Sequence, residues 1–166
     1  MVVVNGDGTF TAVGNGTANI TVSFSGNEKF EPAESKIIDV TVSKIPTEIF
    51  VRNATIDMNV GDEVDSGVRI SPSDAGELDY VSSDVSVVRV DGDGTFVAVG
   101  DGSANVTVSF GGNAKFEPAE SKIITVTVSK IPTEIFVRNA TVDMKIGDEV
   151  DPGVSISPSD AGELDY

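Results

Sequence analysis

Residues 104–110 read Ala-Asn-Val-Thr-Val-Ser-Phe, the most regular alternation of apolar and polar residues in the chain. Side chains on a β-strand point alternately to its two faces, so this stretch predicts a strand with one face in a core. Similar short runs, separated by Gly, Pro, Asp and Ser clusters, fill the region from Ile45 to Lys130. They predict an all-β fold of about eight short strands, and no run has helical spacing.

The chain contains an internal repeat, because Gly6 corresponds to Gly92 and the offset of 86 residues holds throughout. Residues 2–80 align with residues 88–166 without a gap, and 14 of the 79 aligned positions differ. A fixed period of this length is typical of tandem domains and suits a small sandwich better than a solenoid unit. We therefore expect repeats with an immunoglobulin-like (Ig-like) β-sandwich fold, of which residues 45–130 form one complete copy.

Differences between the two copies follow the alternation of the strands. Ile20 and Val106 exchange one β-branched apolar residue for another at an inward position, whereas Asp39 and Thr125 differ in polarity at an outward one. This pattern separates core-facing from solvent-facing positions.

The flanking segments correspond to the two halves of the same repeat. Residues 1–44 match its second half, with the last four strands, and residues 131–166 match its first half, with the first four. Each half alone would expose an apolar sheet face, at a cost of about 25 cal/mol per Å². We expect residues 131–166 of one molecule to complete residues 1–44 of another, which gives a head-to-tail homopolymer.

Two alternatives to this assembly stay open. The ends could be disordered because the boundaries are arbitrary, or the two halves could pair within one molecule. The second alternative is disfavoured because no spacer separates Lys44 from Ile45 or Lys130 from Ile131, which places the halves at opposite poles of the central domain.

Composition excludes several classes of function. The net charge is −16, with 27 acidic and 11 basic residues, which argues against binding of nucleic acid. There is no His and no Cys, and no Ser lies in a nucleophile-elbow motif, so we predict no enzyme and no catalytic residue. No run approaches about 18 apolar residues, so we expect no membrane insertion in this segment.

Calcium is the one cofactor that the sequence suggests. Asp91 and Asp93 lie in an Asp-Gly-Asp-Gly run, but the Glu that ends a calcium loop about twelve positions on is missing. Asp148 and Asp151 form a second acidic cluster. The alternatives are a hairpin turn of the primed type at residues 91–94, in which Gly supplies positive φ, and a solvated turn at the second cluster.

Five Asn-X-Ser/Thr sequons are candidate N-glycosylation sites. They begin at Asn15, Asn19, Asn53, Asn105 and Asn139. Asn19 and Asn105 take outward strand positions, so their side chains should be accessible.

The run from Tyr80-Val-Ser-Ser-Asp84 through Val90, Gly94, Ala98, Gly102, Ala104 and Val106-Thr-Val108 resembles the bacterial Ig-like group 2 domain. Tyr80 stands where that family usually has Trp. Residues 108–116 and 126–130 resemble repeats of archaeal and bacterial adhesin-like surface proteins. The resemblance implies an extracellular, cell-surface location and a role in stalks or adhesive tips.

Two functions are consistent with these observations. The first is a structural stalk or fibre module, and the alternative is an adhesin domain whose loops bind a host or glycan ligand. The aromatic candidates for such binding are Phe30, Phe116, Phe50 and Phe136, and each recurs once per repeat. Repetition favours stalk packing over a unique binding site.

Overall fold

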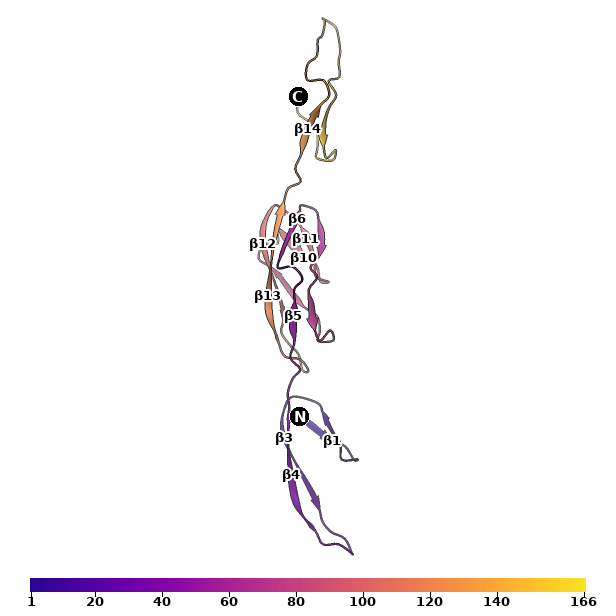
Figure 1. The fold of residues 1–166 in the computed structure, drawn as a ribbon, viewed down its shortest axis with the longest axis vertical. Coiled ribbons are helices and arrows are strands. Elements are labelled where there is room, and N and C mark those ends of the chain that lie inside the picture. Colours follow the sequence, from indigo (N-terminus) through magenta and orange to yellow (C-terminus); the bar gives the residue numbers. More distant parts are fainter.

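A computed structural model describes residues 1–166 as fifteen β-strands without a helix, which confirms the all-β fold. Figure 1 shows a rod in which residues 45–130 form a compact middle part and the flanking segments extend from its opposite ends. No strand of residues 1–44 pairs with a strand of residues 131–166. No helix has the length and hydropathy that a membrane crossing needs.

The middle part is a sandwich-like arrangement of nine strands. They are β5 (Glu48–Phe50), β6 (Thr55–Asn59), β7 (Glu63–Asp65), β8 (Arg69–Ser71), β9 (Asp79–Ser82), β10 (Val88–Val90), β11 (Thr95–Ala98), β12 (Gly102–Phe110) and β13 (Ala119–Ser129). The sheets run β6-β13-β12-β9, β10-β11-β7 and β5-β8. The sequence predicted eight strands and missed β7, because β7 carries a single apolar residue between two acidic ones.

The hydrophobic core lies entirely within this middle part. Its buried residues are Ile49, Met58, Ala75, Val87, Val88, Phe96, Ala98, Ala104, Val106, Val108, Phe110, Phe116, Ile124, Val126 and Val128. The inward positions predicted on β11, β12 and β13 are among them, which confirms the alternation on these strands. Phe116 is one of the aromatic candidates for ligand binding, but its side chain is only 3% exposed and belongs to this core.

The strand pairs of the middle part fall into two classes. β5–β8, β10–β11 and β12–β13 each join strands of the same half of the repeat. β6–β13, β9–β12 and β7–β11 each join a strand of the first half to a strand of the second. The two halves are therefore bound to each other along three ladders, one of which, β6–β13, is parallel.

The flanking segments keep only the first class of pairs. β1 (Val2–Val4) pairs with β2 (Phe10–Ala12), β3 (Gly16–Phe24) with β4 (Ala33–Val42), and β14 (Glu134–Val137) with β15 (Val154–Ser157). Four strands were predicted in residues 131–166, and only these last two form. The reason is that the counterparts of β6 and β9 have no second half to pair with.

The turn at residues 91–94 differs from its prediction. The Gly94 amide donates to the Asp91 carbonyl oxygen at 2.9 Å, and the Asp91 amide donates to that of Thr95 at 2.9 Å. A primed turn needs positive φ at a central residue, but of the residues in this turn only Gly94, its last, has one, at 87°. The predicted primed turn was therefore wrong, and a left-handed Gly ends the turn instead.

Candidate assembly interface

The central domain shows how one half of a repeat binds the other. In the parallel ladder, Val126 of β13 is the partner of Ile56 of β6, and the ladder runs on to the pair Ser129 and Asn59. Two backbone bonds extend it: the Thr125 amide donates to Ala54 at 2.9 Å, and the Val60 amide donates to Ser129 at 3.0 Å.

Aromatic contact reinforces the junction of the halves. Tyr80 of β9 and Phe96 of β11 lie edge to face, with ring centroids 6.5 Å apart and planes at 81°. The Tyr80 ring also covers Gly94, where an added Cβ would lie 2.7 Å from the tyrosine oxygen. Edge-to-face pairs contribute about 0.5–1.5 kcal/mol beyond the area that they bury.

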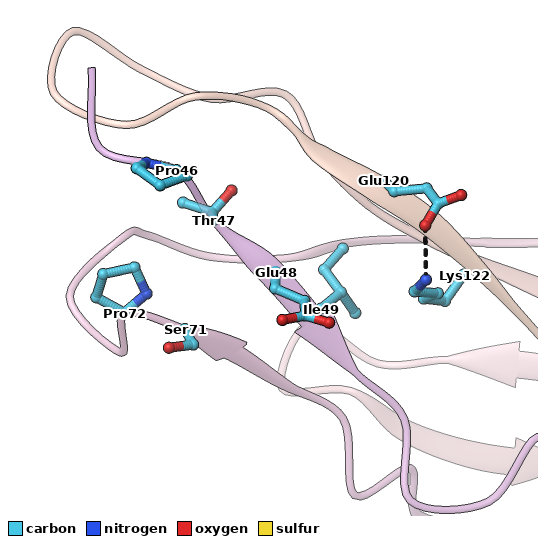
Figure 2. Close-up of a pocket in the computed structure, with 8 residues that line it drawn as sticks. All are labelled: Pro46, Thr47, Glu48, Ile49, Ser71, Pro72, Glu120 and Lys122. Atoms are coloured by element: carbon cyan, nitrogen blue, oxygen red, sulfur yellow. Dashed lines mark hydrogen bonds and ion pairs between the residues drawn. The ribbon is translucent and has the colours of Figure 1, made fainter. Parts of the chain in front are cut away.

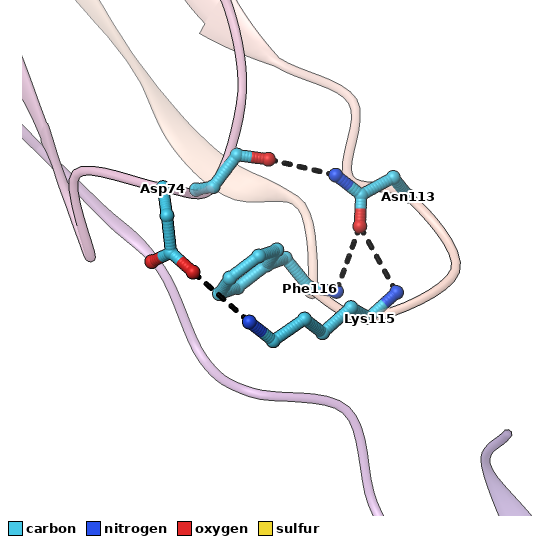
Figure 3. A network of polar contacts seen from close by, with 5 residues as sticks. Asp74, Asn113, Lys115 and Phe116 are labelled. Atoms are coloured by element: carbon cyan, nitrogen blue, oxygen red, sulfur yellow. Dashed lines mark hydrogen bonds and ion pairs between the residues drawn. The ribbon is translucent and has the colours of Figure 1, made fainter. Parts of the chain in front are cut away.

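A loop of the second half is fastened to a loop of the first (Figure 3). The Asn113 side-chain amide donates to the Ala75 carbonyl oxygen at 2.7 Å, and the Lys115 ammonium lies 2.9 Å from an Asp74 carboxylate oxygen. Asn113 also shapes its own loop, because its Oδ1 accepts from the backbone amides of Lys115 and Phe116, each at 3.0 Å. The hydrogen bond from Lys115 lowers the pKa of Asp74.

Sequence reasoning did not identify this polar network. Its signal is present in the repeat, since Asn113, Lys115 and Asp74 recur as Asn27, Lys29 and Asp160. Surface loops of a Gly- and Ser-rich chain contain many such residues, and the alternation that marks strands does not extend into loops. Asn113 and Ala75 are 38 positions apart in the sequence, and Lys115 and Asp74 are 41 positions apart, so only the fold brings them into contact.

In the flanking halves, the residues that correspond to this interface lie open. Phe10 is 39% exposed where its counterpart Phe96 is fully buried, and Tyr166 is 97% exposed. The within-half ladders nevertheless keep the register of the complete domain, down to the irregularity between Val22 and Phe24 that matches the one in β12. Each flanking segment therefore keeps the strand pairing that the corresponding half has in the central domain.

Hydrogen bonds hold residues 45–47, which follow the connection to residues 1–44, against residues 115–117 of the central domain. The Ile45 amide donates to Lys115 at 2.9 Å, and the Glu117 amide donates to Ile45 at 2.8 Å. The Thr47 hydroxyl also donates to the Glu117 carbonyl oxygen at 2.8 Å. Pro46 also restricts the backbone here, so residues 45–47 are held against the central domain.

A shallow pocket of about 510 Å³ lies beside this joint (Figure 2). It is lined by Pro46, Thr47, Glu48, Ile49, Ser71, Pro72, Glu120 and Lys122. The Lys122 ammonium lies 2.8 Å from Glu120, and this contact lowers the pKa of Glu120 and raises that of Lys122. Ile49 is its one hydrophobic lining residue, whereas small-molecule sites are mostly apolar.

The calcium candidates form hydrogen bonds or an ion pair within their own turns. The Asp93 carboxylate accepts from the Thr95 amide at 3.0 Å, Asp148 from the Lys145 amide at 2.8 Å, and Asp151 from the Gly153 amide at 2.8 Å. Asp91 lies 3.9 Å from Arg89. No group of three or more His, Cys, Asp or Glu residues lies close enough together to hold a metal ion. Calcium binding at these residues stays a prediction.

All five sequon asparagines are exposed. Asn19 and Asn105 lie on β3 and β12, and Asn53 and Asn139 follow β5 and β14. The Asn105 Oδ1 accepts a hydrogen bond from the Thr125 hydroxyl at 3.0 Å, across the ladder. Glycosylation at these positions stays a prediction.

No protein-family model matches the chain, and no curated protein sequence matches it. Solved structures similar to it include two of a surface layer protein. "Structure of surface layer protein SbsC, domains 1-6" has 21% identity and a TM-score of 0.46, over 87% of this chain and 20% of that one. "Structure of surface layer protein SbsC, domains 4-9" has 19% identity and a TM-score of 0.44, over 93% of this chain and 25% of that one. The chain thus spans a quarter or less of the length of these structures.

Proposed function

We propose that this chain is a structural module of a cell-surface fibre, built from tandem Ig-like domains that assemble head to tail. Residues 131–166 of one molecule dock on residues 1–44 of another and form a second domain, which lacks only the counterparts of residues 81–86. One observation carries this proposal. Each of the three ladders that join the halves in the central domain is missing from the flanking halves, whereas each within-half ladder is present.

The central domain supplies the register of the proposed contact. Subtracting or adding the 86-residue offset, the pair Val97 and Glu63 becomes Thr11 and Glu149 of two molecules. The parallel ladder likewise joins residues 39–43 of one molecule to residues 141–145 of the other. The partner surface is thus specified position by position by the same chain.

Core composition is consistent with this pairing. Val106 and Ile56 of the central core correspond to Ile20 and Val142, so one methylene group moves from one half to the other and the sum is unchanged. Volume-conserving exchanges are the ones that cores tolerate best. In a third exchange, Ile146 stands where the central domain has Val60, which adds one methylene group.

Energetics favour docking over exposure. Full burial of a large apolar side chain contributes about 1.5–3 kcal/mol, and Phe10, Phe24 and Phe30 are all exposed in the free half. The contact is heterologous and does not close on itself, so it propagates into a linear polymer. No catalytic step is part of this proposal.

The location at the cell surface is supported by the resemblance of residues 80–108 to bacterial Ig-like group 2 domains. The charge of −16 also keeps long rods apart and soluble.

A disulfide trap tests the docking directly, since the chain has no cysteine of its own. In T11C/E149C, the two thiols would face each other only across the proposed contact, at the Cα separation of an antiparallel pair, which a disulfide can bridge. We expect a ladder of covalent multimers on a non-reducing gel that collapses on reduction. The matched control is T11C/E163C, because the counterpart of Glu163, Glu77, lies outside every strand.

Two results would contradict the proposal. One is a T11C/E149C protein that forms no more multimers than the control. The other is a crosslinked monomer, which would show that the halves pair within one molecule.

A further inference from the structure

The loop between β3 and β4 has the same internal geometry as its counterpart in the central domain. The Asn27 amide donates to Phe30 at 2.9 Å, and the Asn27 Oδ1 accepts from the amides of Lys29 and Phe30 at 2.9 and 3.0 Å. The corresponding bonds around Asn113 are all 3.0 Å. The loop therefore holds its shape without the other half of the domain.

The outward groups of this loop lack the partners that their counterparts have. Phe30 is 58% exposed, although Phe116 in the same position is 3% exposed. The Asn113 side-chain amide and the Lys115 ammonium bond to Ala75 and Asp74, but those of Asn27 and Lys29 bond to no residue. Lys29 only lies over the Phe30 ring, 5.3 Å from its centroid.

The complementary loop is also formed in the free half. The Ala161 amide donates to Pro158 at 3.1 Å, as the Ala75 amide donates to Pro72 at 3.0 Å. Asp160 forms no ion pair, and the Ala161 carbonyl oxygen accepts no hydrogen bond. Both surfaces are thus ordered before they meet, which lowers the entropic cost of association.

We infer that Phe30 is the anchor of the contact between molecules, and that it inserts under the loop at residues 158–162 of a second copy of this chain. The Asn27 side chain then donates to the Ala161 carbonyl oxygen, and Lys29 faces Asp160. This inference rests on the proposed head-to-tail assembly and names the residues that determine its strength.

The three contacts contribute unequally to the affinity between molecules. Buried aromatic anchors dominate interfaces, so Phe30 carries most of the affinity. The proposed hydrogen bond of Asn27 adds to it, because its counterpart in the central domain, from Asn113 to Ala75, is partly buried. The ion pair of Lys29 contributes little, because its central counterpart is more than half exposed on both sides.

Sedimentation velocity over a concentration series tests the inference on F30A, N27A and K29A. The matched control is F50A, because Phe50 is 50% exposed on β5 of the central domain and lies outside the proposed contact. We expect F30A to weaken association at least about thirtyfold, as for a hot-spot residue. N27A weakens it less, and K29A and F50A leave it nearly unchanged. Circular dichroism verifies that the central domain melts alike in all four.

The outcomes separate the two claims. If the unmodified chain associates and F30A associates as tightly as F50A, the anchor is refuted and head-to-tail assembly stands. If the unmodified chain does not associate at any micromolar concentration, both claims fail.

Discussion

Phe96 and Phe10 occupy equivalent positions in the two copies of the repeat, 86 residues apart, yet Phe96 is fully buried and Phe10 is 39% exposed. Phe96 is the cross-strand partner of Val64 and lies edge to face with Tyr80, and both of these residues belong to the first half of the repeat. The counterparts that would cover Phe10 are Val150 and Tyr166, which belong to residues 131–166, the segment at the opposite end of the rod from residues 1–44 (Figure 1).

The two phenylalanines should respond differently to truncation. We expect Phe96→Ala to lower the free energy of unfolding of the central domain by about 3–5 kcal/mol, because it leaves a cavity in the core. Phe10→Ala should leave that transition unchanged and weaken association instead. Urea denaturation followed by circular dichroism, at concentrations too low for association, measures the first effect. Equal losses in the two variants would show that the N-terminal half shares the central core.

Gly94 and Gly8 form a second matched pair. Both have left-handed φ, 87° and 86°, which costs a non-Gly residue about 1–2 kcal/mol. An added Cβ would meet the Tyr80 ring at Gly94, whereas nothing lies within 4 Å of it at Gly8. We expect Gly94→Ala to lower the melting temperature of the central domain and Gly8→Ala to leave it unchanged. Because Tyr166 would cover Gly8 in the assembled fibre, Gly8→Ala should also weaken association, and light scattering checks this.

Acid should remove the contribution that the Asp93 carboxylate makes to the stability of the central domain. Hydrogen bonds from the backbone and side chain of Thr95 lower its pKa in the folded state. A lowered folded pKa means that the contribution is fully present above the unfolded value of about 3.9 and is lost as the pH falls through the folded value. The difference in denaturation midpoint between the unmodified chain and Asp93→Asn should thus be constant near neutral pH and shrink below about pH 4. A difference that grows in acid would mean that the carboxylate is not the stabilised form.

Salt should strengthen assembly. Residues 1–44 carry 3 basic and 5 acidic residues, net −2, and residues 131–166 carry 2 basic and 8 acidic residues, net −6. The docking halves therefore repel each other, and screening shortens the range of repulsion from about 10 Å at 0.1 M salt to about 3 Å at 1 M. We expect the association constant to rise with NaCl concentration in sedimentation experiments. A fall would show that opposite charges dominate the contact.

Much of the central domain could be predicted from local pattern, and its pairing could not. Alternation identified the inward faces of β12 and β13, because both strands have one buried face and one polar face. It could not show that β6 lies parallel to β13, since the strands are about seventy residues apart and register depends on the whole fold. β7 was not predicted because its sequence, one apolar residue between two acidic ones, is also typical of a turn.

Residues 141–145 show most clearly that local sequence alone does not determine whether a strand forms. They differ from β6 at only two of five positions, Val142 for Ile56 and Lys145 for Asn59, yet they form no strand. Because the local sequence is nearly the same, we attribute the absence of a strand at residues 141–145 to the absence of a partner strand equivalent to β13. The same reasoning explains why the loop network around Asn113 was not predicted, since its bonds exist only when both halves are present.

The weight-average mass of the 166-residue chain, measured by light scattering across the micromolar range, tests the central claim most directly. If residues 131–166 of one molecule complete residues 1–44 of the next, the mass starts at 17.2 kDa and rises with concentration without a plateau. A mass that stays at 17.2 kDa throughout would contradict head-to-tail assembly.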